Sequence, residues 1–337
     1  MKKTNTLVIG QGIAGTLVAL MLHMNKIPFI VIDPGYVNTA SRIAAGMFTP
    51  ISGKRKTIHP IVLKQILFAI KIYQEMELLL GTTFLHLHNI YQVHNSVKEQ
   101  NNLVRKSFNV DFGKYILTDP VALPCIIQEM GAFEITHSGW VDCGSLINGF
   151  ARWLKQNDAL MEAEFSYEDL EPGKGRMKYQ GMEFSNIIFC EGYQAINNPF
   201  FKKENIIPCK GDILKIRYDN LPIDRIIKKN GIYLIPEGNN IFKAGSTYQW
   251  NNNTIHQDET SKKLIESKLD RMLENKFTTI DHQSGIRPTT QNREVIAKQH
   301  SEHRGMFMLN GLGTKGVLQG PWWAKHVVEL CLRNLYD

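Results

Sequence analysis

Apolar residues near the start of the chain fall into three groups separated by turn residues. Thr6–Ile9 is a short apolar run, Ile13–Met24 is rich in Leu, Ala and Met, and Phe29–Ile32 is again rich in β-forming residues. This order predicts a strand, a helix and a second strand. Further on, residues 60–80 are amphipathic, with proline in front and glycine behind, which predicts a longer helix.

The rest of the chain predicts a mixture of strands and helices. Three apolar runs between residues 206 and 247, separated by Pro, Gly and Asn, are typical of one antiparallel sheet. The late strand and final helix should return to the opening βαβ unit, because that unit lacks enough sheet of its own. The expected strands are 84–93, 132–136, 187–190, 206–217, 231–235, 241–247, 280–287 and 306–309, and the expected helices are 141–154, 258–273 and one ending near 332.

The fold class predicted from this order is α/β, with two domains. A chain of 337 residues usually forms more than one domain. We expect a discontinuous Rossmann-like nucleotide-binding domain of residues 1–82, 138–204 and 280–337. A second, mainly antiparallel-sheet substrate domain should comprise residues 83–137 and 205–279.

The composition is that of a protein that folds throughout, with 43% hydrophobic and 21% charged residues. The net charge of +7 favours acidic ligands, but the basic residues are scattered and form no block. Five widely spaced cysteines without a CxxC pair argue against disulfides and a zinc site, so we expect a cytoplasmic protein. Glycines interrupt the first apolar stretch, so neither a secretory signal nor a membrane span is expected.

A glycine-rich turn lies between the first strand and the first helix. Its residues are Gly10, Gln11, Gly12, Ile13, Ala14 and Gly15. Such glycines make a tight turn, admit a pyrophosphate and let helix pack on strand, while the helix N-terminus faces the phosphates. Asp33 ends the second strand, where a carboxylate can accept hydrogen bonds from both ribose hydroxyls and disfavours a 2′-phosphate. The pattern predicts a dinucleotide other than NADP and does not choose between FAD and NAD.

The choice of FAD comes from a resemblance that several separated segments carry. Together they span nearly the whole chain, and they resemble the family of D-amino-acid oxidase, glycine oxidase and sarcosine oxidase. The matching segments are Ser41–Met47, Trp140–Leu146, Ile187–Tyr193, Pro208–Leu214, Ala244–Thr247, Ser284–Thr290 and Asn310–Val317.

The resemblance implies where FAD would lie. It places the segment around residues 41–47 along the pyrophosphate and flavin ring, and the turn at 311–316 at the pyrimidine edge, where a helix N-terminus stabilises the negative charge of the reduced flavin. Sarcosine oxidase relatives tether the flavin through a cysteine close to that turn; no cysteine lies there in this sequence, so the resemblance implies non-covalent binding of FAD. Besides Gly10, Gly12, Ile13, Ala14, Gly15 and Asp33, the expected FAD-binding residues are Ser41, Arg42, Ala44, Ala45, Gly46, Gly192, Gly311, Leu312, Gly313, Thr314, Lys315 and Gly316.

The candidate catalytic residues are Arg287, Lys315, Gly46 and Met47. By its position in the matching Arg-Pro pair, Arg287 would grip the substrate carboxylate, for which a guanidinium fork is suited. The alternative is a structural arginine paired with an acid. Lys315 could add positive charge beside the flavin or be a solvated lysine. The expected activity is oxidation of the CH–NH bond of an amino acid or secondary amine by hydride transfer to flavin N5, with dioxygen or another acceptor and without a metal.

Departures from the family pattern leave the substrate open. Asn292 and Ala297 stand where the family usually has an acid and a glycine, and Tyr193 stands where tryptophan is common. One alternative is a flavoenzyme acting on a modified tRNA base, which a clustered basic face would favour. Another is a flavin-binding protein without turnover, which a closed cleft and an internally paired Arg287 would favour.

Three weaker groups complete the set of candidates. His86, His88 and His94 have the even spacing of one strand face, but without a nearby acid they are better explained as polar surface or cleft residues than as a metal site. Two further groups are a basic loop near the cleft with Lys54, Arg55 and His59, and Trp322 and Trp323 on the last helix as core packing.

Overall fold

The first half of the fold is a six-stranded sheet, which is parallel except at one edge. The computed structural model describes residues 5–53, 55–119, 121–173, 176–219 and 225–336. In spatial order the strands are β11 (Leu160–Met161), β2 (Phe29–Ile32), β1 (Thr6–Ile9), β15 (Asn186–Phe189), β23 (Met306–Asn310) and β22 (Ile296–Gln299). Only the β22–β23 pair is antiparallel in this sheet.

Both faces of this sheet are covered, as its nearly continuous apolar strands require. Successive residues of a strand point to opposite faces, so Val8 joins one core while Leu7 and Ile9 join another. The helices packed into the Val8 core are α1 (Ile13–Met24), α3 (Val62–Leu80), α6 (Cys143–Gln156) and α8 (Gly316–Tyr336). The core on the other face includes residues of the three-stranded sheet β12 (Leu170–Pro172), β13 (Met177–Tyr179) and β14 (Met182–Phe184).

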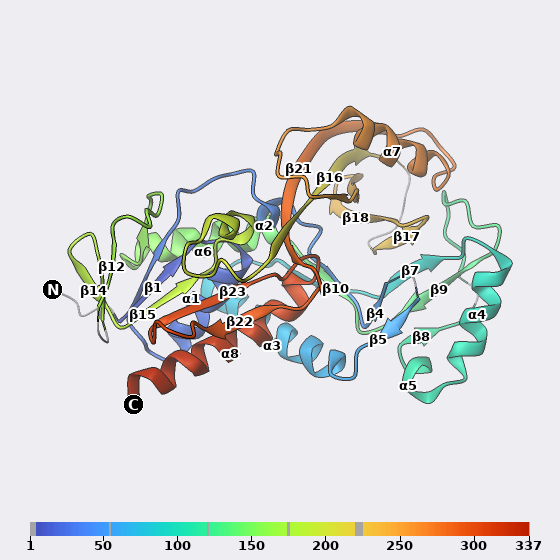
Figure 1. The fold of residues 1–337 in the computed structure, drawn as a ribbon. Coiled ribbons are helices and arrows are strands. Elements are labelled where there is room, and N and C mark those ends of the chain that lie inside the picture. Colours follow the sequence, from blue (N-terminus) through green and yellow to red (C-terminus); the bar gives the residue numbers. More distant parts are fainter. Residues whose placement is uncertain (1–4, 54, 120, 174–175, 220–224, 337) are drawn as a thin grey trace.

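The second half is a nine-stranded, mainly antiparallel sheet. Its strands in order are β20 (Gln249–Trp250), β16 (Ile206–Arg217), β19 (Ile241–Gly245), β18 (Ile232–Gly238), β17 (Ile227–Lys229), β7 (Ile90–Val93), β9 (Ala132–Ile135) and β8 (Ile116–Leu117), with β21 (Thr278–Thr290) paired to β16. Figure 1 shows β16 and β21 running together toward α7 (Glu259–Asp270), and Ile265 and Leu269 of that helix share a core with Leu214 and Ile216 of β16.

Short elements complete the fold. They include α2 (Ala40–Ile43), α4 (Val97–Ser107), α5 (Val110–Gly113), the 3₁₀ turn Gly192–Asn197, the hairpin β4 (Ile51–Ser52) and β5 (Thr57–Ile58), and a small sheet of β3 (Met47–Phe48), β10 (Gly139–Val141) and β6 (Leu85–Leu87). Among the described residues, no helix combines the length and apolarity that crossing a membrane needs.

The predicted fold class is confirmed. The late strand β23 pairs with β15 beside β1, and the runs expected between 206 and 247 are neighbours in one antiparallel sheet. One expected helix begins two residues late, because Val141 still belongs to β10 and Asp142 caps the helix. The domain boundaries stay a prediction; β21, which spans the expected boundary at residue 280, pairs with β16 over its whole length.

Candidate active site

The first glycine turn is packed so closely that side chains are excluded from two of its positions. Gly10 has φ +95°, and a Cβ there would lie 2.6 Å from the Cys190 carbonyl oxygen. A Cβ on Gly15 would lie 1.8 Å from the Gly10 carbonyl oxygen. The glycines therefore let the N-terminus of α1 approach β1 and β15, as a phosphate-binding turn requires.

The N-terminus of α1 is open. Gly12 is the N-cap and has no side chain to accept hydrogen bonds from the early N–H groups of the helix. Ser41 lies beside them, because its Oγ accepts a hydrogen bond from the Ile13 N–H at 2.9 Å. An anion at this point would meet backbone N–H groups and the positive end of the helix dipole.

Asp33 lies where the sequence predicts, at the end of β2 and next to the glycine turn. Its Oδ2 accepts from the Gln11 N–H at 2.6 Å and its Oδ1 accepts from the Gly35 N–H at 2.8 Å. Each carboxylate oxygen retains a further lone pair for a ligand hydroxyl.

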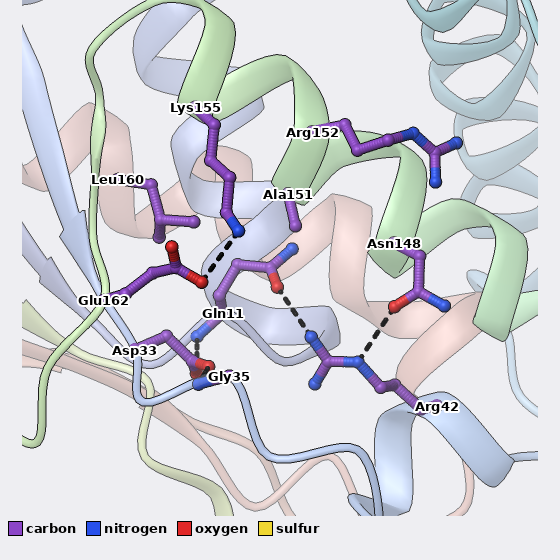
Figure 2. A pocket seen from close by; sticks show the side chains of 10 residues that line it. All are labelled: Gln11, Asp33, Gly35, Arg42, Asn148, Ala151, Arg152, Lys155, Leu160 and Glu162. Atoms are coloured by element: carbon purple, nitrogen blue, oxygen red, sulfur yellow. Dashed lines mark hydrogen bonds and ion pairs between the residues drawn. The ribbon is translucent and has the colours of Figure 1, made fainter.

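A cavity of about 240 Å³ opens beside Asp33, and Figure 2 shows the side chains around it. Arg42 crosses it: its Nη2 donates to Gln11 Oε1 at 3.2 Å and its Nε to Asn148 Oδ1 at 3.1 Å. Burial lowers the pKa of Arg42, against the opposing charge of Asp33. The cavity is lined by Gln11, Asp33, Gly35, Arg42, Asn148, Ala151, Arg152, Lys155, Leu160 and Glu162.

The second glycine turn, residues 311–316, meets the first. Gly311 and Gly313 have φ of +72° and +53°, and a Cβ on Gly316 would lie 3.2 Å from Ile13 Cγ2. Thr314 and Lys315 are exposed, while Leu312 is buried. Gly192 joins this group because its carbonyl accepts from Asn310 Nδ2 at 2.9 Å. The N-termini of α1 and α8 thus lie side by side.

The segment with Ala44, Ala45, Gly46 and Met47 leads from α2 into β3. A Cβ on Gly46 would lie 1.9 Å from the Val141 carbonyl oxygen, so this position has no room for a side chain. Met47 pairs with a tryptophan of β10, and both Ala45 and Met47 pack against the apolar cluster that contains this tryptophan and Tyr233 of β18.

Strand β21 brings Arg287 to the same place. A Cβ on Gly285 would lie 2.6 Å from Ile43 Cδ1, so β21 lies directly against α2. Further along β21, the Pro288 carbonyl accepts a hydrogen bond from the Gly313 N–H of the second glycine turn at 2.9 Å. The structure therefore gathers the segments around 41–47, 285–290 and 311–316, which are far apart in the sequence.

Arg287 is held by neutral groups. Its Nη2 donates to Ser246 Oγ at 2.9 Å, and its Nη1 donates to the Thr247 carbonyl at 3.2 Å. Its guanidinium carbon lies 4.7 Å from the ring centre of Tyr248, which is 54% exposed. A Cβ on Gly211 would lie 2.1 Å from Nη2, so the guanidinium occupies the space that a side chain at this position would fill.

The phenol of Tyr233 and the thiol of Cys209 lie on the same face of the sheet as Arg287, given the register of β16, β18, β19 and β21. Burial raises the pKa of Tyr233, and the positive charge of Arg287 opposes this shift only in part. Burial likewise raises the pKa of Cys209, again against Arg287. Both groups are uncharged at neutral pH, so Arg287 is the charged member of these three neighbours.

This arrangement agrees with a comparison of the sequence with known families. The family described as FAD dependent oxidoreductase matches residues 5–330. The chain belongs to this family. It is therefore an FAD-dependent oxidoreductase.

Solved structures of this oxidoreductase family share the fold along almost the whole chain. Glycine oxidase from Geobacillus kaustophilus is 19% identical with a TM-score of 0.81, covering 98% of this chain and 94% of that one. Iminodiacetate oxidase from Chelativorans sp. BNC1 is 16% identical with a TM-score of 0.81, covering 98% of this chain and 95% of that one. L-α-glycerophosphate oxidase from Mycoplasma pneumoniae, solved with FAD bound, is 15% identical with a TM-score of 0.76. The match covers 98% of this chain and 95% of that one.

The residues of this oxidoreductase fit an extended FAD. The side-chain-free turn and the open N-terminus of α1 suit a pyrophosphate, and the cavity beside Asp33 suits a nucleoside. At the other end, the backbone of 311–316 and the short side chains at 44–46 are the groups that would face the flavin ring. The sequence did not point to Asn148, Lys155 and Glu162, because their contribution to the cavity depends on the packing of α6 and β11 against β2.

The weaker candidates do not join this site. Contrary to expectation, the three histidines do not all share one face. His86 and His88 both stack on Trp140, whereas His94 follows β7 in the other sheet and packs on Phe133. No group of three metal-ligating side chains occurs among the described residues. Arg55 and His59 are exposed, Lys54 lies outside the described residues, and Trp322 and Trp323 are half-buried.

Proposed function

We propose that this flavoenzyme oxidises the CH–NH bond of an amino acid or a small secondary amine that carries a carboxylate. FAD would be bound non-covalently by the residues predicted from the sequence, with its adenosine at Gly10–Asp33 and its ring between Ala44–Gly46 and Gly311–Lys315. The substrate would lie between that ring and the face of the second sheet that holds Arg287.

The observation that carries this proposal is the state of Arg287. In the part of the chain that the structure describes, Arg287 forms no ion pair with a carboxylate, and it donates hydrogen bonds to the uncharged oxygens of Ser246 and Thr247. A half-buried guanidinium with donors to spare is suited to a ligand carboxylate, which it can grip through two parallel hydrogen bonds. A structural arginine paired with an acid, and a flavin-binding protein whose Arg287 is already paired, both lack support.

In the proposed reaction, each protein group either orients the substrate or stabilises charge on the flavin. Arg287 would hold the carboxylate so that the Cα–H faces the flavin, and Met47 would pack beside the substrate. The backbone N–H groups at 311–316, with Lys315, would stabilise negative charge at the pyrimidine edge. Bound FAD supplies hydride acceptance, and dioxygen or another acceptor would reoxidise it.

Names of the related structures support a carboxylate-bearing amine. Glycine oxidase and iminodiacetate oxidase are both named for such compounds. The glycerophosphate oxidase shows that the same fold also carries another substrate class. The substrate therefore has to be tested directly.

The deciding experiment is anaerobic titration of the purified yellow protein, followed by its visible flavin absorbance. The panel would contain glycine, sarcosine, iminodiacetate, and D- and L-amino acids, with the corresponding simple amines as carboxylate-free controls. We expect one carboxylate-bearing amine to bleach the flavin and its carboxylate-free analogue to do so much more slowly. A flavin that no member reduces would contradict the proposal and shift the assignment to a modified tRNA base.

A further inference from the structure

The sheet face opposite Arg287 contains a buried cluster of charged and polar side chains that the proposed reaction does not use. Asp212 is fully buried at the centre of β16, and Lys210, two residues earlier on the same face, is 2% exposed. Around them lie three further groups from β21 and the segment after β19. The members of this Asp212 cluster are Lys210, Asp212, Thr247, His282 and Ser284.

Asp212 is the centre of the cluster because every member contacts its carboxylate. His282 Nε2 lies 2.9 Å from Oδ1, and Ser284 Oγ donates to the same oxygen. Lys210 Nζ lies 3.6 Å from Oδ2, and Thr247 Oγ1 donates to Oδ2 at 3.2 Å. Burying a carboxylate is unfavourable unless such partners satisfy it.

Thr247 connects this cluster to Arg287. On one side its hydroxyl accepts from the Asp212 N–H at 2.9 Å and donates to the Asp212 carboxylate. On the other side its carbonyl accepts from Arg287 Nη1. Gly211, against which the guanidinium packs, lies between Lys210 and Asp212 in the same strand.

The cluster therefore ties together the three segments that surround the guanidinium. Asp212 and Lys210 come from β16, His282 and Ser284 from β21, which carries Arg287, and Thr247 from the segment that supplies both hydrogen-bond acceptors of Arg287. A purely apolar interior would pack this face against α7 equally well, because buried ion pairs seldom stabilise more than apolar groups of the same volume. Directional bonds fix relative position, which apolar contacts do not.

We propose that Asp212 is a positioning residue, which acts through Thr247 to hold Arg287 in the orientation that receives the substrate carboxylate. This inference rests on the proposed function, because it takes Arg287 as the carboxylate-binding group. It assigns to the buried cluster a role in substrate affinity that is separable from its role in folding.

The test compares two threonine-to-valine variants of the FAD-loaded protein. Thr247→Val removes the hydroxyl that joins Asp212 to the segment 246–248 and keeps the carbonyl that Arg287 uses. Thr279→Val is the matched control, because Thr279 Oγ1 also donates to a carboxylate, Glu266 Oε1 at 2.8 Å, but at the far end of β21 from Arg287. The probes are acetate and its uncharged analogue acetamide, titrated by calorimetry.

We expect Thr247→Val to weaken acetate binding about tenfold, because a misplaced fork loses the paired geometry that a carboxylate needs. Acetamide binding, the FAD dissociation constant and the melting temperature should then change no more than in Thr279→Val. The double variant Lys210→Gln/Asp212→Asn, which removes both buried charges together, should weaken acetate at least as much.

Two failures are distinguishable. If the unaltered protein does not bind acetate, or if Arg287→Gln leaves acetate binding unchanged, the proposed function fails and the positioning role fails with it. If Arg287→Gln weakens acetate binding but Thr247→Val and the double variant bind acetate within about twofold of the unaltered protein, the positioning role alone is wrong. Equal weakening of acetate and acetamide would also contradict it, since that result indicates a distorted sheet.

Discussion

The two sheets of this oxidoreductase assemble their halves of the candidate site differently. On the six-stranded sheet, the dinucleotide turn and Asp33 all come from one continuous βαβ unit, residues 6–33. On the nine-stranded sheet, Arg287 takes its surroundings from β16, β21 and the segment after β19, which are widely separated in the chain.

This difference explains why the cofactor is easier to infer than the substrate. A local unit places its glycines and its acid by strand and helix geometry alone, so their spacing in the sequence carries the information. Arg287 depends on strand register, because Gly211 must lie where the guanidinium folds over β16. Substitutions in the two regions should therefore separate FAD binding from substrate binding.

The largest effect is expected in the first region, from Gly10→Ala. The new Cβ would lie 2.6 Å from the Cys190 carbonyl oxygen, at a backbone φ of +95°. Overlap and backbone strain together should lower the free energy of unfolding by about 4 kcal/mol. Loss of the close approach of α1 should also leave the protein colourless. Denaturant unfolding and the ratio of flavin to protein absorbance measure both.

Gly181→Ala is the matched control for that variant. Gly181 also has positive φ, +76°, but no atom lies within 4 Å of its Cβ position. Only the backbone cost of about 1 kcal/mol should remain, with full FAD content. If the two variants behaved alike, the close packing of the Gly10 turn would not be the reason for its glycine.

The residues and elements of the first region could be predicted from the sequence almost completely, and those of the second region only in part. The turn at Gly10, the acid at Asp33 and the strands β16, β18 and β19 were all predictable, because periodicity and turn residues are local signals. The Asp212 cluster was not, since nothing in the sequence brings His282 or Thr247 to Asp212 until β16 pairs with β21.

The predicted common face of the three histidines was wrong for a related reason. Even spacing suggested one strand through His86, His88 and His94, yet the chain leaves β6 after Leu87 and enters a different sheet with β7. A break of this kind depends on which strands are available as partners, and the spacing of three residues does not contain that information.

In the second region, Arg287→Gln should give the next largest effect. Glutamine keeps a hydrogen-bond donor but loses the charge and the fork, so kcat/KM for the carboxylate-bearing substrate should fall about 100-fold, or about 2.7 kcal/mol. FAD content and the melting temperature should stay unchanged, because the hydrogen bonds of Arg287 to Ser246 and Thr247 lie within the second sheet, away from the Gly10 turn. Steady-state kinetics and the flavin spectrum check the two parts.

Arg287→Lys refines that result. Lysine keeps the charge without the planar fork, so an intermediate loss is expected if two parallel hydrogen bonds matter. Loss of FAD from either variant would place Arg287 in the cofactor region and remove the contrast between the two sheets.

A smaller effect is expected from Asp33→Asn, which belongs to the first region again. The amide retains one acceptor oxygen in place of two, so the FAD dissociation constant should rise about tenfold while kcat at saturating FAD is unchanged. Fluorescence titration of the FAD-depleted protein measures this constant. Glu162→Gln is the control, because Glu162 lines the same cavity but pairs with Lys155 at 2.7 Å. Equal effects would mean that FAD affinity depends on the negative charge around the cavity and not on the position of Asp33.

The smallest effect concerns two aspartate helix caps, one in each region. Asp142 caps α6 beside the candidate flavin segment, and Asp258 caps α7 behind the second sheet. Burial pushes the pKa of Asp142 upward, but hydrogen bonds from the Ser145 hydroxyl and N–H, together with the charge of Lys243 and the Gly144 N–H, lower the pKa overall. The hydrogen bond from the Ser261 hydroxyl is the largest influence on Asp258 and lowers its pKa to about 2.

Because both carboxyl groups have a lower pKa in the folded than in the unfolded state, each stabilises the fold above about pH 4 and ceases to do so as the pH falls through its folded pKa. Asp142→Ala should therefore cost about 1 kcal/mol at pH 7 and less in acid. For Asp258→Ala the penalty should fade between about pH 4 and pH 2. Only Asp142→Ala should also weaken FAD binding, because the start of α6 packs directly on the candidate flavin segment. A Cβ built on Gly46 of that segment would lie only 3.1 Å from Cys143 Sγ, the first residue of α6. If Asp258→Ala weakened FAD binding equally, the second sheet would be coupled to the cofactor and the division between the two regions would not hold.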